Sequence, residues 1–288
     1  MLRLGLRAHD YGKNVPPEEL AQILAPYGPA SVQLALAKAL SGAPLCGSFT
    51  SAYAGHVRQI LEEKNIAIAV LGCYINPVHP DPDVREGQLR LFEEHLRFAL
   101  DFGCALVGTE TGSCNGDCSF HPDTEKPATF DLLCFSLERL VKTAEKHGSV
   151  VAVEAVADVH TVSTVEKMQK LLRRLASPAL KVIYDPVNLI PGAGLYESQE
   201  QFFTQAFDAF GNEIAAIHAK DFRMEGNKKN GALPAGTGEL DYSALLRIIM
   251  ERKPCIDILL EDTDPDTGIK ALEYLRSMEE AIKKSNLQ

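Results

Sequence analysis

The chain alternates short apolar runs, rich in β-branched residues, with longer segments whose apolar positions recur at helical spacing. Several of the short runs are continuously apolar, which is typical of parallel strands covered on both faces. The pattern therefore predicts eight strand–helix units. The runs predicted to form the strands are residues 2–7, 31–36, 66–74, 105–109, 150–156, 180–184, 214–218 and 256–260.

The segments between these runs carry helix-terminating and helix-starting residues. Residues 89–100 repeat large apolar side chains at helical spacing, and Gly103 follows at a position suited to a helix C-cap. Ser163 and Glu166 fit a capping box at the start of a later helix. Asp241 is placed to cap the helix that follows it. These positions support the helical assignment of the intervening segments.

Eight β/α units over 288 residues predict a single (β/α)₈ TIM barrel, an α/β fold in which residues 1–288 form one domain. A doubly wound open sheet is the alternative. That alternative requires a glycine-rich phosphate loop after the first strand, and neither GxGxxG nor GxxxxGK[ST] occurs there. The barrel is therefore the simpler interpretation.

Charge and composition narrow the possible partners. The net charge is −10 and no basic stripe is evident, which argues against a nucleic-acid partner. No apolar stretch approaches the roughly 18 residues of a membrane span, and the first residues lack the apolar core of a signal peptide. Seven cysteines, an odd number scattered along the chain, indicate reduced thiols. We therefore expect a cytoplasmic protein without nucleic-acid or membrane partners.

Four consecutive predicted strands end in side chains that can bind a metal. Glu154, Asp185, His218 and Glu261 each lie at or near the end of a strand. The active site of a (β/α)₈ barrel lies at the C-terminal ends of its strands, so these side chains can converge there. Each residue alone could instead pair with a loop amide or a lysine. Together they suit one divalent cation, with Mn²⁺ expected and Mg²⁺, Co²⁺ or Zn²⁺ as alternatives.

Several motifs around these strand ends resemble the sugar phosphate isomerase/epimerase family of xylose isomerase-like TIM barrels, and the ketose 3-epimerases in particular. The motifs are "VAVEAVADVHT", "VIYDPVNL", "IHAKDF", "GTGELDY" and "LLEDT". The resemblance implies that Glu154, Asp185, His218 and Glu261 bind one divalent metal ion. It also implies that Glu154 and Glu261 form the catalytic acid/base pair.

The function expected from this site is metal-dependent isomerisation or epimerisation of a sugar or sugar phosphate, by proton abstraction and return through a metal-stabilised enediolate. One alternative is a dehydratase of an inosose-like ketone on the same barrel. A weaker alternative is an endonuclease IV-like phosphodiesterase, which would need a second-metal histidine where this chain has Asn188. A sugar-binding protein without catalysis is the third.

Further residues near the strand ends are candidates for substrate binding. His160 lies six residues after Glu154, where the ketose 3-epimerases are expected to place a substrate-contacting glutamate. Lys220 is either a substrate contact or the partner of Asp221 in a braced loop. The other candidates are Glu110, His79, Asn188 and Arg223.

The loop at residues 236–239 could cradle an anion at a helix N-terminus, although a tight turn is favoured. The expected partner of the site is a small-molecule sugar. The sequence leaves assembly into a homo-oligomer open.

Overall fold

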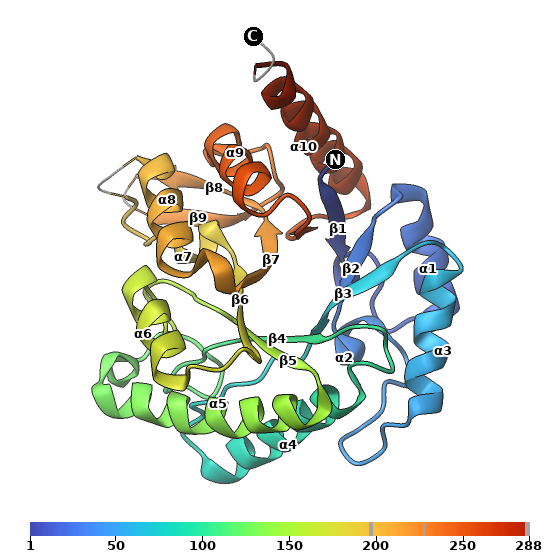
Figure 1. The fold of residues 1–288 in the computed structure, drawn as a ribbon, viewed down its shortest axis with the longest axis vertical. Coiled ribbons are helices and arrows are strands. Elements are labelled where there is room, and N and C mark those ends of the chain that lie inside the picture. The colour runs from blue at the N-terminus through green and yellow to red at the C-terminus, as the bar shows by residue number, and fades with distance from the viewer. Residues whose placement is uncertain (196–197, 227, 286–288) are drawn as a thin grey trace.

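The computed structural model describes residues 1–195, 198–226 and 228–285. In this part of the chain, eight parallel strands close into a barrel in the order β1-β10-β7-β6-β5-β4-β3-β2, surrounded by helices (Figure 1). The predicted (β/α)₈ fold class is therefore confirmed. The barrel strands are β1 (Arg3–Arg7), β2 (Ser31–Leu34), β3 (Ala67–Gly72), β4 (Leu106–Glu110), β5 (Val150–Glu154), β6 (Leu180–Tyr184), β7 (Ile214–Ala219) and β10 (Asp257–Leu260).

The interior of the barrel is filled by a small apolar layer. Val70, Ala152, Ile183, Ala216 and Leu259 form one buried cluster inside the ring of strands. Glycine is required beside this layer at position 108, because a Cβ there would lie 2.7 Å from Ile183 Cδ1 and 2.8 Å from Val70 Cγ1. Side chains alternate along a strand, so the residue two positions beyond each member of this layer also faces the interior, at the C-terminal mouth.

The helices pack their apolar faces against the outside of the barrel. In α4, Leu89, Phe92 and Leu96 are buried, whereas Leu100 in the following turn is exposed. The helices are α1 (Pro17–Leu24), α2 (Leu36–Ala39), α3 (Ser51–Glu62), α4 (Pro82–Phe98), α5 (Pro127–His147), α6 (Val165–Leu175), α7 (Pro186–Leu189), α8 (Gln199–Phe210), α9 (Tyr242–Arg252) and α10 (Pro265–Ser285).

One of the three predicted helix-terminal residues is confirmed as a cap. α4 ends at Phe98 with Ala99 as its C-cap, earlier than predicted, and Gly103 (φ +73°) ends the following turn, where its N–H donates to the carbonyl oxygen of Leu100. Asp241 caps α9 by accepting a hydrogen bond from the N–H of Ala244.

The capping box of Ser163 and Glu166 is wrong by one residue. Thr164 is the N-cap of α6 and accepts from the N–H of Lys167. The Ser163 hydroxyl instead contacts Glu125, at 3.3 Å from its Oε1. Both neighbouring residues are good N-caps, so the sequence alone does not decide between them.

A second small sheet lies between β7 and α9, and the sequence analysis did not predict it. The antiparallel strands β8 (Asp221–Glu225) and β9 (Lys228–Leu233) form a hairpin. β9 alternates between exposed and half-buried residues and carries no apolar run, so the pattern used for barrel strands does not detect it. The hairpin is attached to the segment after β6, because Lys229 donates its ammonium protons to the carbonyls of Val187 and Ile190.

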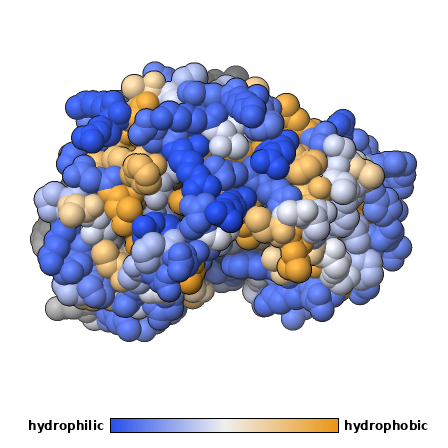
Figure 2. Space-filling view, turned by 90° about the horizontal axis from the view of Figure 1, so that it is seen from below, coloured by the Kyte–Doolittle hydropathy of each residue, from blue (hydrophilic) through white to orange (hydrophobic). Residues whose placement is uncertain are grey.

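The surface is consistent with the composition. Figure 2 shows one face of the molecule, on which hydrophilic residues predominate and hydrophobic ones form small separate groups. Among the described residues, no helix combines the length and the apolar character needed to cross a bilayer.

Candidate metal centre

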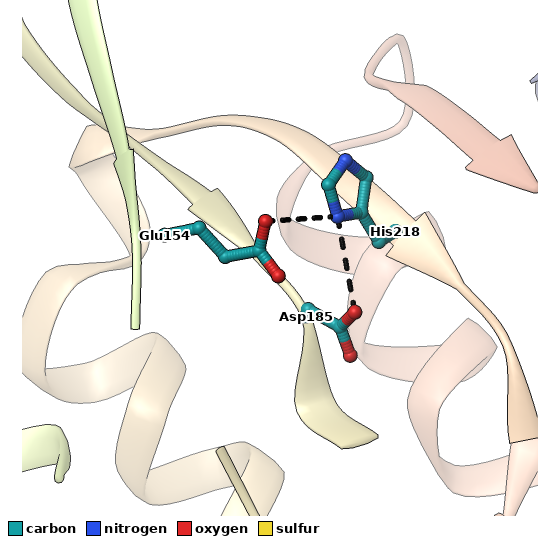
Figure 3. Close-up of side chains that lie close together, drawn as sticks. All are labelled: Glu154, Asp185 and His218. Atoms are coloured by element: carbon teal, nitrogen blue, oxygen red, sulfur yellow. Dashed lines mark ion pairs between the residues drawn. The ribbon is translucent and has the colours of Figure 1, made fainter. Parts of the chain in front are cut away.

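Glu154, Asp185 and His218 meet at the C-terminal mouth of the barrel. Each residue offers one ligand atom, and the three atoms lie within 4.8 Å of one another in a buried group (Figure 3). His218 Nδ1 is 3.3 Å from Glu154 Oε2 and 3.8 Å from Asp185 Oδ2. The three side chains come from the adjacent strands β5, β6 and β7, which explains why residues far apart in the sequence converge.

Strand geometry places these side chains. Each follows a residue of the inner apolar layer by two positions, so it points into the barrel at the next level. The corresponding pairs are Ala152 and Glu154, Ile183 and Asp185, and Ala216 and His218. The convergence of these three side chains is thus a consequence of the strand register.

The two carboxylate oxygens of Asp185 have different surroundings. Its Oδ1 accepts the N–H of Asn188 at 2.9 Å, which caps α7 at the end of β6. Its Oδ2 is buried and makes no hydrogen bond among the described residues, and the same holds for His218 Nδ1. Leaving such buried atoms unsatisfied costs free energy, so atoms of this kind need an explanation.

The residues present fit a divalent cation. Two carboxylates and one imidazole form a mixed oxygen and nitrogen set, which suits ions such as Mn²⁺, Mg²⁺ or Zn²⁺. Asp185 Oδ2 and His218 Nδ1, which make no hydrogen bond among the described residues, both lie in this group, where Oδ2 has the Lys220 ammonium 2.9 Å away as an ion-pair partner. A cation would also offset the cost of burying two carboxylates side by side. Glu154, Asp185 and His218 can therefore hold a metal ion.

Glu261 lies at the edge of this group. Its Oε1 is 3.3 Å from His218 Nδ1, so it approaches the same nitrogen as Glu154. Two cationic side chains also hold it: Arg7 Nη1 lies 3.1 Å from Oε1, and Lys220 Nζ lies 3.1 Å from Oε2. The three-residue group that can hold a metal does not include Glu261 in this geometry.

The buried charges shift one another's pKa values. Burial lowers the pKa of His218, but the surrounding carboxylates Glu261 and Glu154 outweigh it and raise the pKa to about 9. Burial raises the pKa of Glu154, against the opposing effect of His218. For Glu261 the same burial effect is outweighed by His218, Lys220 and Arg7, which lower its pKa. The two glutamates therefore lie in unlike electrostatic surroundings.

Lys220 reaches into this cluster, and the alternative in which it pairs with Asp221 is not found among the described residues. Its ammonium lies 2.9 Å from Asp185 Oδ2, besides its contact with Glu261. Asp221 instead accepts the backbone N–H groups of Phe222, Gly236 and Leu240.

The loop at residues 236–239 therefore surrounds an anion that belongs to the chain itself, the Asp221 carboxylate. A Cβ at Gly238 would lie 2.4 Å from Asp221 Oδ1, so this glycine lets the loop approach closely.

Three of the predicted substrate-binding residues lie near the cluster. Asn188 donates a side-chain hydrogen bond to Glu154 Oε1. His160 is buried, its Nδ1 has no hydrogen-bond partner among the described residues, and its Nε2 is 3.8 Å from Glu110 Oε2. Glu110 ends β4, beside β5. These residues stay candidates for substrate contact.

His79 and Arg223 make their hydrogen bonds away from the cluster. His79 Nδ1 accepts the N–H of Asp81 at 3.1 Å, in the turn before α4. Arg223 is exposed on the β8–β9 hairpin and donates to the carbonyl oxygen of Thr237 at 2.8 Å. Neither residue contacts the metal-binding group in this geometry.

Three further residues of the cluster were not predicted from the sequence: Arg7, Gln33 and Tyr74. Arg7 binds Glu261 as described above and also Asp10, with Nε to Oδ2 at 2.9 Å. Gln33, in β2, places its Oε1 2.6 Å from His218 Nε2 and donates its amide protons to the hydroxyl of Tyr74. The same two-residue step from inward-facing positions, applied to β1 and β2, would have identified Arg7 and Gln33.

Solved structures with this fold include named sugar epimerases. The chain is similar to an L-ribulose 3-epimerase (TM-score 0.76, 12% identity, covering 99% of this chain and 97% of the other). It is also similar to a D-psicose 3-epimerase from Clostridium cellulolyticum H10, determined with D-tagatose (0.71, 12%, 96% and 99%). A third is a xylose isomerase-like TIM barrel protein from Mycobacterium smegmatis in complex with magnesium (0.70, 16%, 98% and 97%). At these identities the likeness establishes the fold alone.

A comparison with curated protein sequences finds no match. The model of the xylose isomerase-like TIM barrel family, in contrast, matches residues 24–279, which is most of the chain. This match agrees with the closed parallel barrel and with the resemblance found in the strand-end motifs. The chain therefore belongs to the xylose isomerase-like TIM barrel family.

Proposed function

We propose that this protein is a divalent-metal-dependent enzyme that epimerises or isomerises a sugar, with Glu154 and Glu261 as its acid/base pair. One observation carries the proposal. The two glutamates approach the same nitrogen, His218 Nδ1, from two different strands, each at 3.3 Å, beside a buried group that can hold a cation. Two carboxylates placed in this way can face a small substrate from two sides.

The metal and the chain have separate tasks in this proposal. A divalent cation held by Glu154, Asp185 and His218 would polarise a ketose carbonyl and so acidify the adjacent C–H bond. One glutamate then accepts the proton of that carbon, and the other supplies a proton from the opposite face. Return to the same carbon inverts it and gives an epimer, whereas return to the neighbouring carbon exchanges ketose and aldose.

The surrounding side chains orient the two carboxylates for this task. The Asn188 amide holds Glu154 Oε1, while Arg7 and Lys220 hold the two oxygens of Glu261. Because each glutamate is fixed by a partner, its reactive oxygen is positioned before a substrate binds. His160, buried with a free Nδ1, is available to hydrogen-bond a sugar hydroxyl.

The similar structures support a sugar substrate and a metal ion. Two of them are named as 3-epimerases of ketoses, and a third contains magnesium. We propose ketopentoses and ketohexoses as the substrate class and Mn²⁺ as the preferred ion.

The test is hydrogen exchange in D₂O. The protein, loaded with Mn²⁺ or Mg²⁺, is incubated with a panel of ketoses, and the sugars are recovered and analysed by mass spectrometry and NMR. We expect deuterium at the carbon next to the carbonyl of at least one sugar, together with its epimer or the corresponding aldose.

The matched variant is Glu261→Gln, which keeps the size of the side chain but removes its ability to accept a proton. We expect turnover to fall by at least about 10²-fold, the usual contribution of a general acid or base. Absence of exchange with every sugar, at full metal occupancy, would exclude the proposal. Loss of one water from a substrate would instead identify a dehydratase.

A further inference from the structure

A histidine binds a metal through a nitrogen that carries no proton. In a neutral imidazole one nitrogen is protonated and the other is not, and the hydrogen bond made by the first decides which one is free. His218 is fully buried, so protein groups alone surround both of its nitrogens. Its Nδ1 faces Glu154, Asp185 and Glu261, and its Nε2 faces Gln33.

We propose that Gln33 is a positioning residue that keeps a proton on Nε2 of His218, so that Nδ1 is the nitrogen through which the ring binds the metal. This inference rests on the metal-binding function proposed above. Gln33 Oε1 lies 2.6 Å from Nε2, and an amide oxygen can only accept a hydrogen bond. The Nε2–H must therefore be the donor, which fixes the tautomer.

Tyr74 contacts the other end of the Gln33 amide. The amide nitrogen donates to the Tyr74 hydroxyl, so the donor end of Gln33 is used away from the imidazole. The reversed amide would direct an N–H group at Nε2, and the proton of the ring would then sit on Nδ1. In that state Nδ1 could not bind a metal. The chain His218–Gln33–Tyr74 therefore distinguishes a binding-competent ring from an incompetent one.

Gln33 reaches His218 from a strand that is not its neighbour in the barrel. β2 does not neighbour β7; β1 and β10 lie between them in the barrel order. Gln33 is almost fully buried and reaches the histidine through the barrel interior, where an apolar side chain would pack without a desolvation cost. Groups that orient a metal-bound histidine typically change metal affinity by 10–100-fold when they are removed.

The first experiment measures Mn²⁺ affinity by electron paramagnetic resonance of the free ion. Gln33→Met keeps the length of the side chain and removes the strong acceptor, whereas Gln33→Glu keeps an acceptor in the same place. We expect Gln33→Met to weaken Mn²⁺ binding at least tenfold and Gln33→Glu to bind within threefold of the wild type or more tightly. Circular dichroism of the metal-free variants checks that each is folded.

The second experiment uses the unmodified protein and does not depend on how a variant folds. Zn²⁺ is diamagnetic, so long-range ¹H–¹⁵N NMR of the Zn²⁺-loaded protein can report which nitrogen of His218 carries a proton. The His218 signals are assigned by their loss in His218→Asn. We expect a protonated Nε2 and a metal-bound Nδ1.

The outcomes separate this inference from the proposed function. Wild-type protein that binds neither Mn²⁺ nor Zn²⁺ would refute the metal site itself. Metal binding in the wild type with a loss below tenfold in Gln33→Met, or an equal loss in Gln33→Glu, would overturn the role of Gln33 alone. A proton on Nδ1 of the loaded protein would overturn it as well. A merely structural role of Gln33 would change the stability of the metal-free variants but not the tautomer.

Discussion

The carboxylate of Asp221 holds the segment after β9 against the barrel, and substitution of Asp221 tests this role. The carboxylate is almost fully buried and has no ion-pair partner among the described residues. Its Oδ1 accepts the N–H groups of Phe222 and Leu240, both at 2.9 Å, and its Oδ2 accepts the N–H of Gly236 at 3.0 Å. The perturbation is Asp221→Asn, which has the same shape but replaces one oxygen with a donor.

The magnitude follows from these three contacts. A hydrogen bond to a charged group contributes about 1.5–3 kcal/mol, and a buried donor left without a partner costs about 1–3 kcal/mol. The asparagine oxygen can still accept from Phe222 and Leu240, without the benefit of the charge. Its amide group, however, faces the N–H of Gly236, so two donors meet. We expect a loss of about 3 kcal/mol in the free energy of unfolding.

The assay is equilibrium unfolding in urea, with Asp264→Asn as the matched control. Asp264 is exposed, and its Oδ1 accepts the N–H groups of Asp266 and Thr267 at 2.9 and 2.8 Å. Asparagine is also a good cap and water can reach these groups, so we expect a much smaller loss than in Asp221→Asn. Equal losses in the two variants would refute the reasoning, because burial would then not decide the cost.

Three further predictions concern the site and the outer packing. Asp185→Asn should lose the bound divalent ion, measured by mass spectrometry of metal content, while circular dichroism stays that of the folded barrel. Burial raises the pKa of Glu279, but hydrogen bonds from Lys283 and the backbone of Leu2 lower it to about 2. Because its pKa in the folded protein is lowered, Glu279 contributes stability that is present above about pH 4.5 and is lost as the pH falls toward 2. Glu279→Gln should remove this pH dependence from urea titrations. Gly268→Ala should destabilise the protein by about 1–3 kcal/mol, because the new Cβ would lie 2.1 Å from the Tyr11 hydroxyl oxygen. Alanine by itself favours helices, so thermal unfolding shows which effect is larger.

Much of the fold could be predicted because parallel barrel strands have a strong local pattern. Strands covered on both faces are continuous apolar runs, and each of the eight predicted runs contains an observed strand or nearly all of it. The boundaries differed where an apolar run continued past the strand. Residues 66–74 are apolar almost throughout, yet β3 ends at Gly72. Hydrophobicity thus marks a strand but does not mark the point where pairing stops.

The hairpin shows the opposite case. β8 and β9 lie outside the barrel and expose much of their surface, so they carry little hydrophobic pattern. Their position is determined by distant contacts, such as that of Lys229 with the carbonyl of Val187 at 2.6 Å. A contact between residues 42 positions apart leaves no periodic trace in the sequence.

The convergence of three side chains that can hold a metal could be predicted for a related reason. Glu154, Asp185 and His218 interrupt or end apolar runs, and an ionisable residue there is conspicuous. Gln33 is neither ionisable nor a usual metal ligand, and its contact with His218 spans 185 positions. Arg7 follows a short first strand and is 254 positions from Glu261. Their roles depend on barrel closure, which brings β1 and β2 opposite the strands that carry the ligands.

The mouth of the barrel then appears as one layer to which all eight strands contribute. The residues of this layer, at or just beyond the strand ends, are Arg7, Gln33, Tyr74, Glu110, Glu154, Asp185, His218 and Glu261. Each is reached from a different strand, so one of them can change without altering the packing below it. This separation explains how a barrel can match an L-ribulose 3-epimerase with a TM-score of 0.76 at 12% identity. Chemistry specific to this chain therefore depends on the residues of this layer. In this layer an amide holds Glu154, whereas two cations hold Glu261. This difference predicts that substitution of one glutamate will affect proton removal and proton return differently from substitution of the other.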